Sequence, residues 1–102
     1  MDTKQDITAF IYDKRGRVLS VGKNSYVKTH PLQAKHAKQV GLDDKVFLHA
    51  EIAAIAKCKD LERAHKILVV RMGREGKTLL AKPCPVCMSA IHSTGIKYID
   101  HT

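Results

Sequence analysis

The sequence predicts a single α/β domain spanning residues 1–102, built on a minimal mixed sheet in the element order β-β-α-β-α-β. Three observations predict this fold class. Two short β-branched segments separated by a turn open the chain, and two segments of good helix formers follow. A near-continuous apolar run lies between those two helices, as expected for a strand-helix-strand arrangement. The length of 102 residues allows one modest core.

The first half of the chain predicts a hairpin and a buried helix. Residues 7–12 and 18–22 are β-branched or apolar, and residues 13–17 between them have turn chemistry. Residues 22–27 leave the second strand through Gly22 and Asn24, which tolerate turn conformations and would let a ligand approach the backbone. Residues 28–45 hold four Lys, two His and one Pro without a clear period, which indicates a loop that could include a helical turn around residues 32–40. Residues 48–58 are mostly Ala and Ile and predict a helix packed closely on the sheet.

The second half predicts the strand between the helices, the second helix and a closing strand. Residues 66–72 are typical of a central strand covered on both faces. Residues 73–77 form a turn, and residues 78–81 could extend a strand or lead into the next segment. Pro85 suits the first position of a helix over residues 85–93, which Gly95 ends. Residues 96–100 alternate and predict the last strand, and the strand-helix-strand units should run parallel.

The composition predicts a cytoplasmic protein with an aliphatic core. Hydrophobic residues make up 44% of the chain, whereas the aromatic residues are two Phe and three Tyr. The polar start and the lack of a long apolar run indicate neither a signal peptide nor a membrane span, so no membrane partner is expected. The net charge of +8 favours a phosphate-bearing partner, either a nucleotide or a polymer. Lysines scattered over a solvated surface are the alternative explanation.

Residues at the starts of the two predicted helices form a candidate zinc centre. His49 opens the first helix, and Cys84 and Cys87 open the second. Two of the three cysteines lie in one C-x-x-C, which in an intracellular protein favours metal or redox chemistry over a disulfide. Helix dipoles favour thiolates at these positions. Three protein ligands leave a zinc coordination position for water, whose pKa the metal lowers.

Glu51 is the candidate general acid/base of this centre. It lies about 200° from His49 around the helix axis, so the two side chains cannot point in one direction. Glu51 can nevertheless reach over the metal without ligating it, which suits a proton shuttle between the zinc-bound water and a substrate. Backbone N–H groups near Cys84 are candidate partners for a developing negative charge on oxygen.

Other interpretations of these residues remain open. The Cys84-Pro-x-Cys87 segment could be a thioredoxin-like redox pair, although that leaves the His-x-Glu pattern unexplained. A structural zinc knuckle could use His92, His101 or Cys58 as a fourth ligand. Cys58 lies nine residues beyond His49, which points it to the far side of one helix, and we interpret it as a core thiol. A lone His or Glu on a helix is more often structural or solvated.

At these residues the chain resembles the cytidine and deoxycytidylate deaminase superfamily, whose signature is His-x-Glu followed by Pro-Cys-x-x-Cys. The resemblance covers nearly the whole chain, since family members also place a hairpin before the first zinc helix and a strand between the two zinc helices. It implies a cytidine deaminase-like three-layer fold. It also implies Zn²⁺ bound by His49, Cys84 and Cys87, with Glu51 as general acid/base.

The resemblance further implies hydrolytic deamination of a cytosine nucleoside or nucleotide, with deoxycytidylate or cytidine as the first expectation and ammonia as a product. Asn24 would contact the sugar, and Ala50 and Pro83 would offer backbone contacts to the base. One alternative keeps the chemistry but takes a base in single-stranded DNA or RNA, including tRNA adenosine, although few aromatic residues are present for stacking. Another is a non-catalytic zinc-containing nucleotide-binding module.

The resemblance also bears on partners. The extra helices and fifth strand that many relatives use to close the pocket are not evident, so we expect a homo-oligomer, a dimer or tetramer, whose other subunits complete the pocket. A basic loop would flank the pocket mouth and bind phosphate, with a solvated loop as the alternative. Its residues are Tyr26, Lys28, His30, Lys35, His36 and Lys38.

Overall fold

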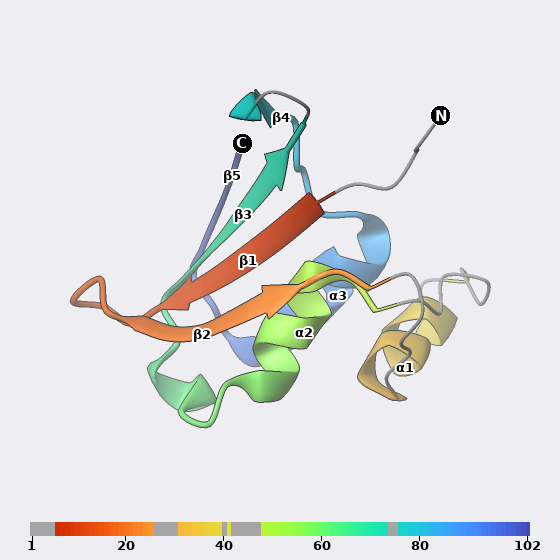
Figure 1. The fold of residues 1–102 in the computed structure, drawn as a ribbon. Helices are drawn as coiled ribbons and strands as arrows, with labels where there is room; N and C mark the ends of the chain where they lie inside the picture. Colours follow the sequence, from red (N-terminus) through yellow and green to blue (C-terminus); the bar gives the residue numbers. More distant parts are fainter. Residues whose placement is uncertain (1–5, 26–30, 40, 42–47, 74–75) are drawn as a thin grey trace.

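A computed structural model of the chain describes residues 6–25, 31–39, 41, 48–73 and 76–102 (Figure 1). In chain order its elements are β1 (Asp6–Tyr12), β2 (Val18–Lys23), α1 (Pro31–Gln39), α2 (Ala50–Lys57), the 3₁₀ helix η1 (Leu61–Arg63), β3 (Lys66–Met72), β4 (Thr78–Leu79), α3 (Pro85–Thr94) and β5 (Tyr98–His101). The predicted mixed α/β fold is therefore confirmed. No helix in the described part of the chain has the length and apolarity that a bilayer crossing requires.

The five strands form one mixed sheet. Its order is β2-β1-β3, and β4 and β5 share the other side of β3. β1 is antiparallel to both β2 and β3, whereas β5 is parallel to β3, as predicted for a strand-helix-strand unit. β5 pairs with the beginning of β3, where Ile67 lies opposite Ile99, and β4 pairs with its end, where Met72 lies opposite Thr78.

A buried carboxylate organises the turn between β1 and β2. The side chain of Asp13 is 6% exposed, and its Oδ1 accepts hydrogen bonds from the backbone N–H groups of Arg15 and Arg17, both at 2.9 Å. Gly16 takes a φ of 82°, a left-handed conformation that favours glycine. The Asp13 side chain thus stabilises the turn through hydrogen bonds to its backbone, and Gly16 allows the backbone conformation that the turn needs.

The sequence prediction was least complete between the hairpin and the first zinc helix. The segment predicted as a loop with a helical turn contains a regular helix, α1, that begins at Pro31, a residue suited to the first helical position. α1 packs against α3 and α2, and Gln33 is fully buried. Contacts with other helices rather than a strong apolar pattern of its own therefore stabilise α1.

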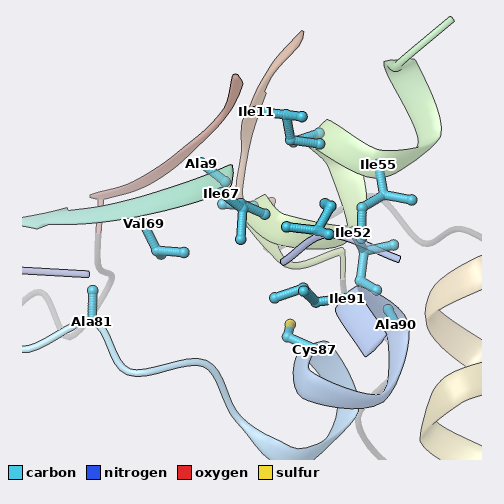
Figure 2. Packing of buried hydrophobic residues seen from close by; sticks show 13 residues of the cluster. Ala9, Ile11, Ile52, Ile55, Ile67, Val69, Ala81, Cys87, Ala90 and Ile91 are labelled. Atoms are coloured by element: carbon cyan, nitrogen blue, oxygen red, sulfur yellow. The ribbon is translucent and has the colours of Figure 1, made fainter. Parts of the chain in front are cut away.

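The core lies between the sheet and two helices on one of its faces. α2 and α3 lie on the same side of the sheet (Figure 1). Ile11 of β1 and Ile67 of β3 point toward these helices and meet Ile52 of α2 and Ile91 of α3 (Figure 2). All four isoleucines are 0% exposed, and burying a side chain of this size stabilises a fold by roughly 1.5–3 kcal/mol. The predicted aliphatic core is therefore present.

The opposite face of the sheet carries residues of intermediate burial, including Phe10 of β1 and Leu68 of β3. No helix of the described ranges covers that face. β3 was predicted to be covered on both faces, and in the described residues only the face of Ile67 and Val69 is buried. The apolar residues of β3 that alternate with these two are half-buried.

A close approach of β2 to α2 fixes the position of α2 on the sheet. A Cβ atom at Gly22 would lie 2.5 Å from the carbonyl oxygen of Ala50 and 2.8 Å from the carbonyl carbon of Ala53, so only glycine fits there. Two residues earlier, the buried Oγ of Ser20 donates a hydrogen bond to the carbonyl oxygen of Ala54 at 2.7 Å. The backbone that approaches Gly22 is that of α2, whereas the sequence suggested a ligand.

Candidate zinc centre

Two helix starts bring the predicted ligands together. His49 is the N-cap of α2 and Cys84 is the N-cap of α3, and both have extended backbone conformations, with φ of −86° and −72°. Neither side chain forms a capping hydrogen bond, although the N-cap position usually holds a residue that does. Both side chains are therefore available to other partners, and they point toward one another.

The ligand atoms of three residues form a compact group. Nδ1 of His49 lies 3.2 Å from Sγ of Cys87 and 3.5 Å from Sγ of Cys84. The three atoms all lie within 4.8 Å of one another. Cys87 is fully buried in the first turn of α3, where it also borders the aliphatic core (Figure 2). The fold thus brings together residues that are 35 and 38 positions apart in the sequence.

The donor set fits zinc. One imidazole nitrogen and two cysteine sulfurs are ligands that Zn²⁺ prefers, and three protein ligands leave a coordination position open. Among the described residues, His49, Cys84 and Cys87 form the one such group, and it does not include His92, His101 or Cys58. Cys58 instead caps the end of α2 and packs against the core, as predicted. The described residues therefore offer no fourth ligand for a structural zinc knuckle.

The pKa values of the two thiols are shifted in opposite directions. A hydrogen bond from Cys87 and, to a smaller extent, the neighbouring His49 lower the pKa of Cys84 to about 4, against the opposing effect of its burial. The same hydrogen bond raises the pKa of Cys87, and the burial of the Cys87 side chain raises this pKa as well. One thiolate and one thiol are thus favoured in this arrangement, and zinc binding would release the remaining proton because the metal binds thiolates.

Glu51 lies beside this group without belonging to it. It is in the first turn of α2 and is only 5% exposed. Burial raises the pKa of its carboxyl, while a hydrogen bond with the Cys87 side chain and the charge of His49 act in the opposite direction. A buried carboxyl next to the ligands, with a raised pKa, holds a proton more readily than a solvated carboxyl does, which suits a group that accepts and then donates a proton.

A buried amide that the sequence interpretation missed holds the first ligand. Oε1 of Gln33, on α1, accepts a hydrogen bond from the backbone N–H of His49 at 3.2 Å. Gln33 is fully buried, whereas glutamine is mostly exposed in folded proteins. No signal in the sequence pointed to this residue, because it lies in a polar segment without a clear period.

The predicted substrate residues lie near the start of α2 or α3. Oδ1 of Asn24 accepts a hydrogen bond from the backbone N–H of Ile7 at 3.1 Å, which ties the end of β2 to the start of β1. The backbone N–H of Ser25 donates to the carbonyl oxygen of Leu48 at 2.8 Å, so this segment runs beside the residue that precedes His49. Ala50 follows His49 in the sequence and Pro83 precedes Cys84, and both Ala50 and Pro83 are buried.

The structure describes part of the predicted basic loop. Lys35 and Lys38 are exposed on α1. The residues Tyr26, Lys28 and His30 lie outside the described part of the chain, as does the side chain of His36. α1 packs against α3, so the two exposed lysines belong to a helix that borders the zinc centre.

The structure thus describes an α/β domain whose His49, Cys84 and Cys87 group is suited to zinc, with the buried carboxyl of Glu51 beside that group. The sequence model of one family, the cytidine and deoxycytidylate deaminase zinc-binding region, matches residues 1–100. The chain belongs to this family. No curated protein matches the chain.

Proposed function

We propose that this protein is a zinc-dependent hydrolytic deaminase of a cytosine nucleoside or nucleotide, with deoxycytidylate and cytidine as the first substrates to test. Its membership of the deaminase zinc-binding family and the His49, Cys84 and Cys87 group support this proposal. The observation that carries it is the buried Glu51 beside Cys87. A purely structural zinc site has no use for a buried carboxyl that is not a ligand.

Each residue has a distinct role in the proposed reaction. His49, Cys84 and Cys87 would hold the metal, which would supply the Lewis acidity that makes water a nucleophile near neutral pH. Glu51 accepts a proton from the attacking water and passes it to the ring nitrogen of the base. It then accepts the second proton, from the hydroxyl group added to the base, and donates it to the amino group. The bond between carbon and the amino nitrogen breaks, ammonia leaves, and a carbonyl remains on the base. Because Glu51 is buried, its proton exchanges with substrate rather than with bulk solvent.

The substrate would lie between the end of β2 and the starts of α2 and α3. Asn24 would contact the sugar, and the backbones of Ala50 and Pro83 would contact the base. The backbone N–H of Cys84 would stabilise negative charge that develops on oxygen. The hydrogen bond between Leu48 and Ser25, next to Asn24, supports this placement because it keeps the end of β2 beside the start of α2.

A panel of cytosine, adenine and guanine nucleosides and nucleotides, assayed for ammonia release, tests the proposal. We expect turnover of a cytosine compound, and we expect Glu51→Gln to lose about 10²–10⁴-fold in rate, the usual contribution of general acid/base catalysis. Asp100→Asn, which neutralises an exposed carboxylate on β5, is the matched control and should retain full activity. Zinc content should be unchanged in both variants. Ammonia release that survives Glu51→Gln would refute the mechanism, and none from the zinc-loaded wild type would indicate the non-catalytic module.

A base in single-stranded DNA or RNA is the second candidate substrate. The net charge of +8 favours it, as do Lys35 and Lys38 on the helix next to the zinc centre. Polymer binding releases counterions, so affinity for a short single strand should fall steeply as salt concentration rises. Affinity that is too weak to measure at low salt would leave free nucleosides and nucleotides as the substrates.

We also propose that the protein forms a homo-oligomer, a dimer or tetramer, whose neighbouring subunit completes the pocket. Exposed apolar side chains support this proposal, notably Leu80 at 68% exposed, just before the segment that leads to Cys84. Light scattering of the zinc-loaded protein would give its mass directly. A strictly monomeric mass together with full activity would contradict the proposal.

A further inference from the structure

A basic hollow lies at the opposite end of α3 from the zinc centre. It has a volume of about 410 Å³ and is formed by the β1–β2 turn, the η1 region and the segment after α3, which come together at the end of the hairpin (Figure 1). Its lining residues are Asp13, Lys14, Arg15, Glu62, Arg63, Ala64, His65, Gly95 and Lys97. A second hollow of about 300 Å³ adjoins it and shares Asp13, Lys14 and His65.

The charges of this hollow favour an anion. Four of its lining side chains are Lys or Arg, whereas two are acidic. Among the described residues Lys14, Arg15 and Lys97 form no ion pair, so their positive charges are not neutralised within this part of the structure. The remaining acidic residue besides Asp13 is Glu62, which is exposed.

Asp13 pairs with Arg63 and does not neutralise Lys14, Arg15 or Lys97. Its carboxylate accepts the two backbone N–H groups of the turn and lies 3.4 Å from a guanidinium nitrogen of Arg63 and 3.8 Å from Nε of Arg17. Arg63 also pairs with Asp60 at 3.7 Å. These contacts hold Arg63 in place on the wall of the hollow, and its side chain remains 52% exposed.

We propose that this hollow binds a chain of phosphate groups. Guanidinium groups match phosphate oxygens in geometry, and lysine ammonium groups add point charges around them. The volume exceeds what a single phosphate fills and lies within the range of small-ligand sites, which favours a ligand with several phosphates. Both a free polyphosphate group and a nucleic-acid backbone offer this chemistry.

The site is separate from the zinc centre and does not rest on the proposed function. α3 has ten residues, so its rise places Gly95 about 15 Å from the cysteine end. A ligand in the hollow therefore touches neither the metal ligands nor Glu51. Binding should be the same whether or not the protein deaminates a nucleotide.

Amide chemical shifts of the zinc-loaded protein, titrated with inorganic tripolyphosphate at constant ionic strength, test the proposal. We expect saturable shifts around residues 13–15, 62–65 and 95–97. Lys97→Gln should weaken binding about 3- to 5-fold, in line with an exposed charge pair. Glu62→Gln should strengthen it, because it removes a negative charge from the rim. Lys77→Gln, an exposed lysine near the β3–β4 turn, is the matched control and should change nothing.

Competition by a short single-stranded oligonucleotide then distinguishes the two sources of phosphate. Displacement of tripolyphosphate from the same residues identifies a nucleic-acid backbone as the ligand, and failure to displace it identifies a small phosphorylated ligand. Both results support the site. Equal effects of Lys97→Gln and Lys77→Gln, or shifts spread over lysines across the whole surface, would overturn it.

Discussion

The buried side chain of Gln33 accepts a hydrogen bond from the backbone N–H of His49 at 3.2 Å, and this bond ties α1 to the start of α2. His49 is the N-cap of α2, where the chain turns from an extended conformation into the helix. Fixing its backbone fixes the direction in which the imidazole leaves the helix. Gln33 is therefore a positioning residue for His49, the candidate metal ligand at the start of α2.

Gln33→Met should destabilise the fold and weaken zinc binding. Methionine has a similar shape but no acceptor, so the N–H of His49 loses its partner at a cost of about 1–3 kcal/mol. Zinc affinity should fall about tenfold, as is usual when a residue that supports a ligand is changed. Denaturant unfolding and competition with a chromogenic chelator would measure the two effects.

Lys35→Met controls for the helix itself. It introduces methionine, as Gln33→Met does, but at an exposed position of α1. We expect the unfolding free energy and the zinc affinity to stay close to wild type. If Lys35→Met weakens zinc binding as much as Gln33→Met does, the hydrogen bond to His49 is not what positions the ligand.

Substitution of each of the three cysteines by serine should affect the zinc content of the protein differently. Cys84→Ser and Cys87→Ser should each lose the single zinc, because a hydroxyl is a far poorer ligand than a thiolate. Cys58→Ser should retain it, since Cys58 is the C-cap at the far end of α2 and packs against the core. Atomic emission on dialysed protein gives the metal-to-chain ratio. One zinc per chain in Cys87→Ser would mean that the ligand set is different.

The hairpin, both zinc helices and the parallel strands could be predicted because their signals are local. Short segments of β-branched or apolar residues on either side of a turn predicted β1 and β2, and an Ala-rich and Ile-rich run predicted α2. Pro85 and Gly95 marked the two ends of α3 to within one residue. The grouping of His49 with Cys84 and Cys87 was expected from the His-x-Glu and Pro-Cys-x-x-Cys pattern, whose two halves fall at the starts of the two predicted helices.

The features that could not be predicted depend on contacts between distant segments. α1 has no marked apolar face, so nothing in its own sequence predicts that it packs against α3. Gln33 resembles any surface glutamine until its burial is known. Likewise, position 22 requires glycine because the backbone of α2, more than 25 residues away in the chain, leaves no space for a Cβ atom. Local periodicity carries no information about such pairs.

Gly22→Ala should shift α2 and destabilise the protein. The added Cβ would meet the carbonyl oxygen of Ala50 at 2.5 Å and the backbone nitrogen of Ala54 even closer, and backbone atoms cannot move aside as a flexible side chain can. Overpacking of this kind costs about 1–3 kcal/mol or more. Zinc affinity should fall too, because His49 begins the helix that is displaced.

Val21→Ala is the matched control for Gly22→Ala. Val21 is the preceding residue of β2, points to the other face of the sheet and is 41% exposed. Its truncation should change unfolding free energy by less than about 1 kcal/mol and leave zinc affinity unchanged. Wild-type stability in Gly22→Ala would show that β2 and α2 do not approach as closely as described.

The carboxylate of Asp13 should make part of the stability depend on pH. Hydrogen bonds from the backbone N–H groups of Arg17 and Arg15 lower the pKa of Asp13 below its usual range, and the charges of Arg17 and Arg63 add to this effect. Because the folded-state pKa lies below the unfolded one, the stabilisation is fully present above the ordinary Asp pKa and is lost as pH falls through the folded value.

Asp13→Asn tests this dependence, because asparagine can still accept both backbone hydrogen bonds but cannot hold a charge. We expect the variant to be less stable than wild type at neutral pH, with the gap narrowing as pH falls from about 5 toward 2. Denaturant unfolding of both proteins across that range, each stripped of zinc by a chelator so that metal release does not contribute, gives the difference directly. The sign is specific, since a gap that widens on acidification would mean that the folded state raises the pKa of Asp13.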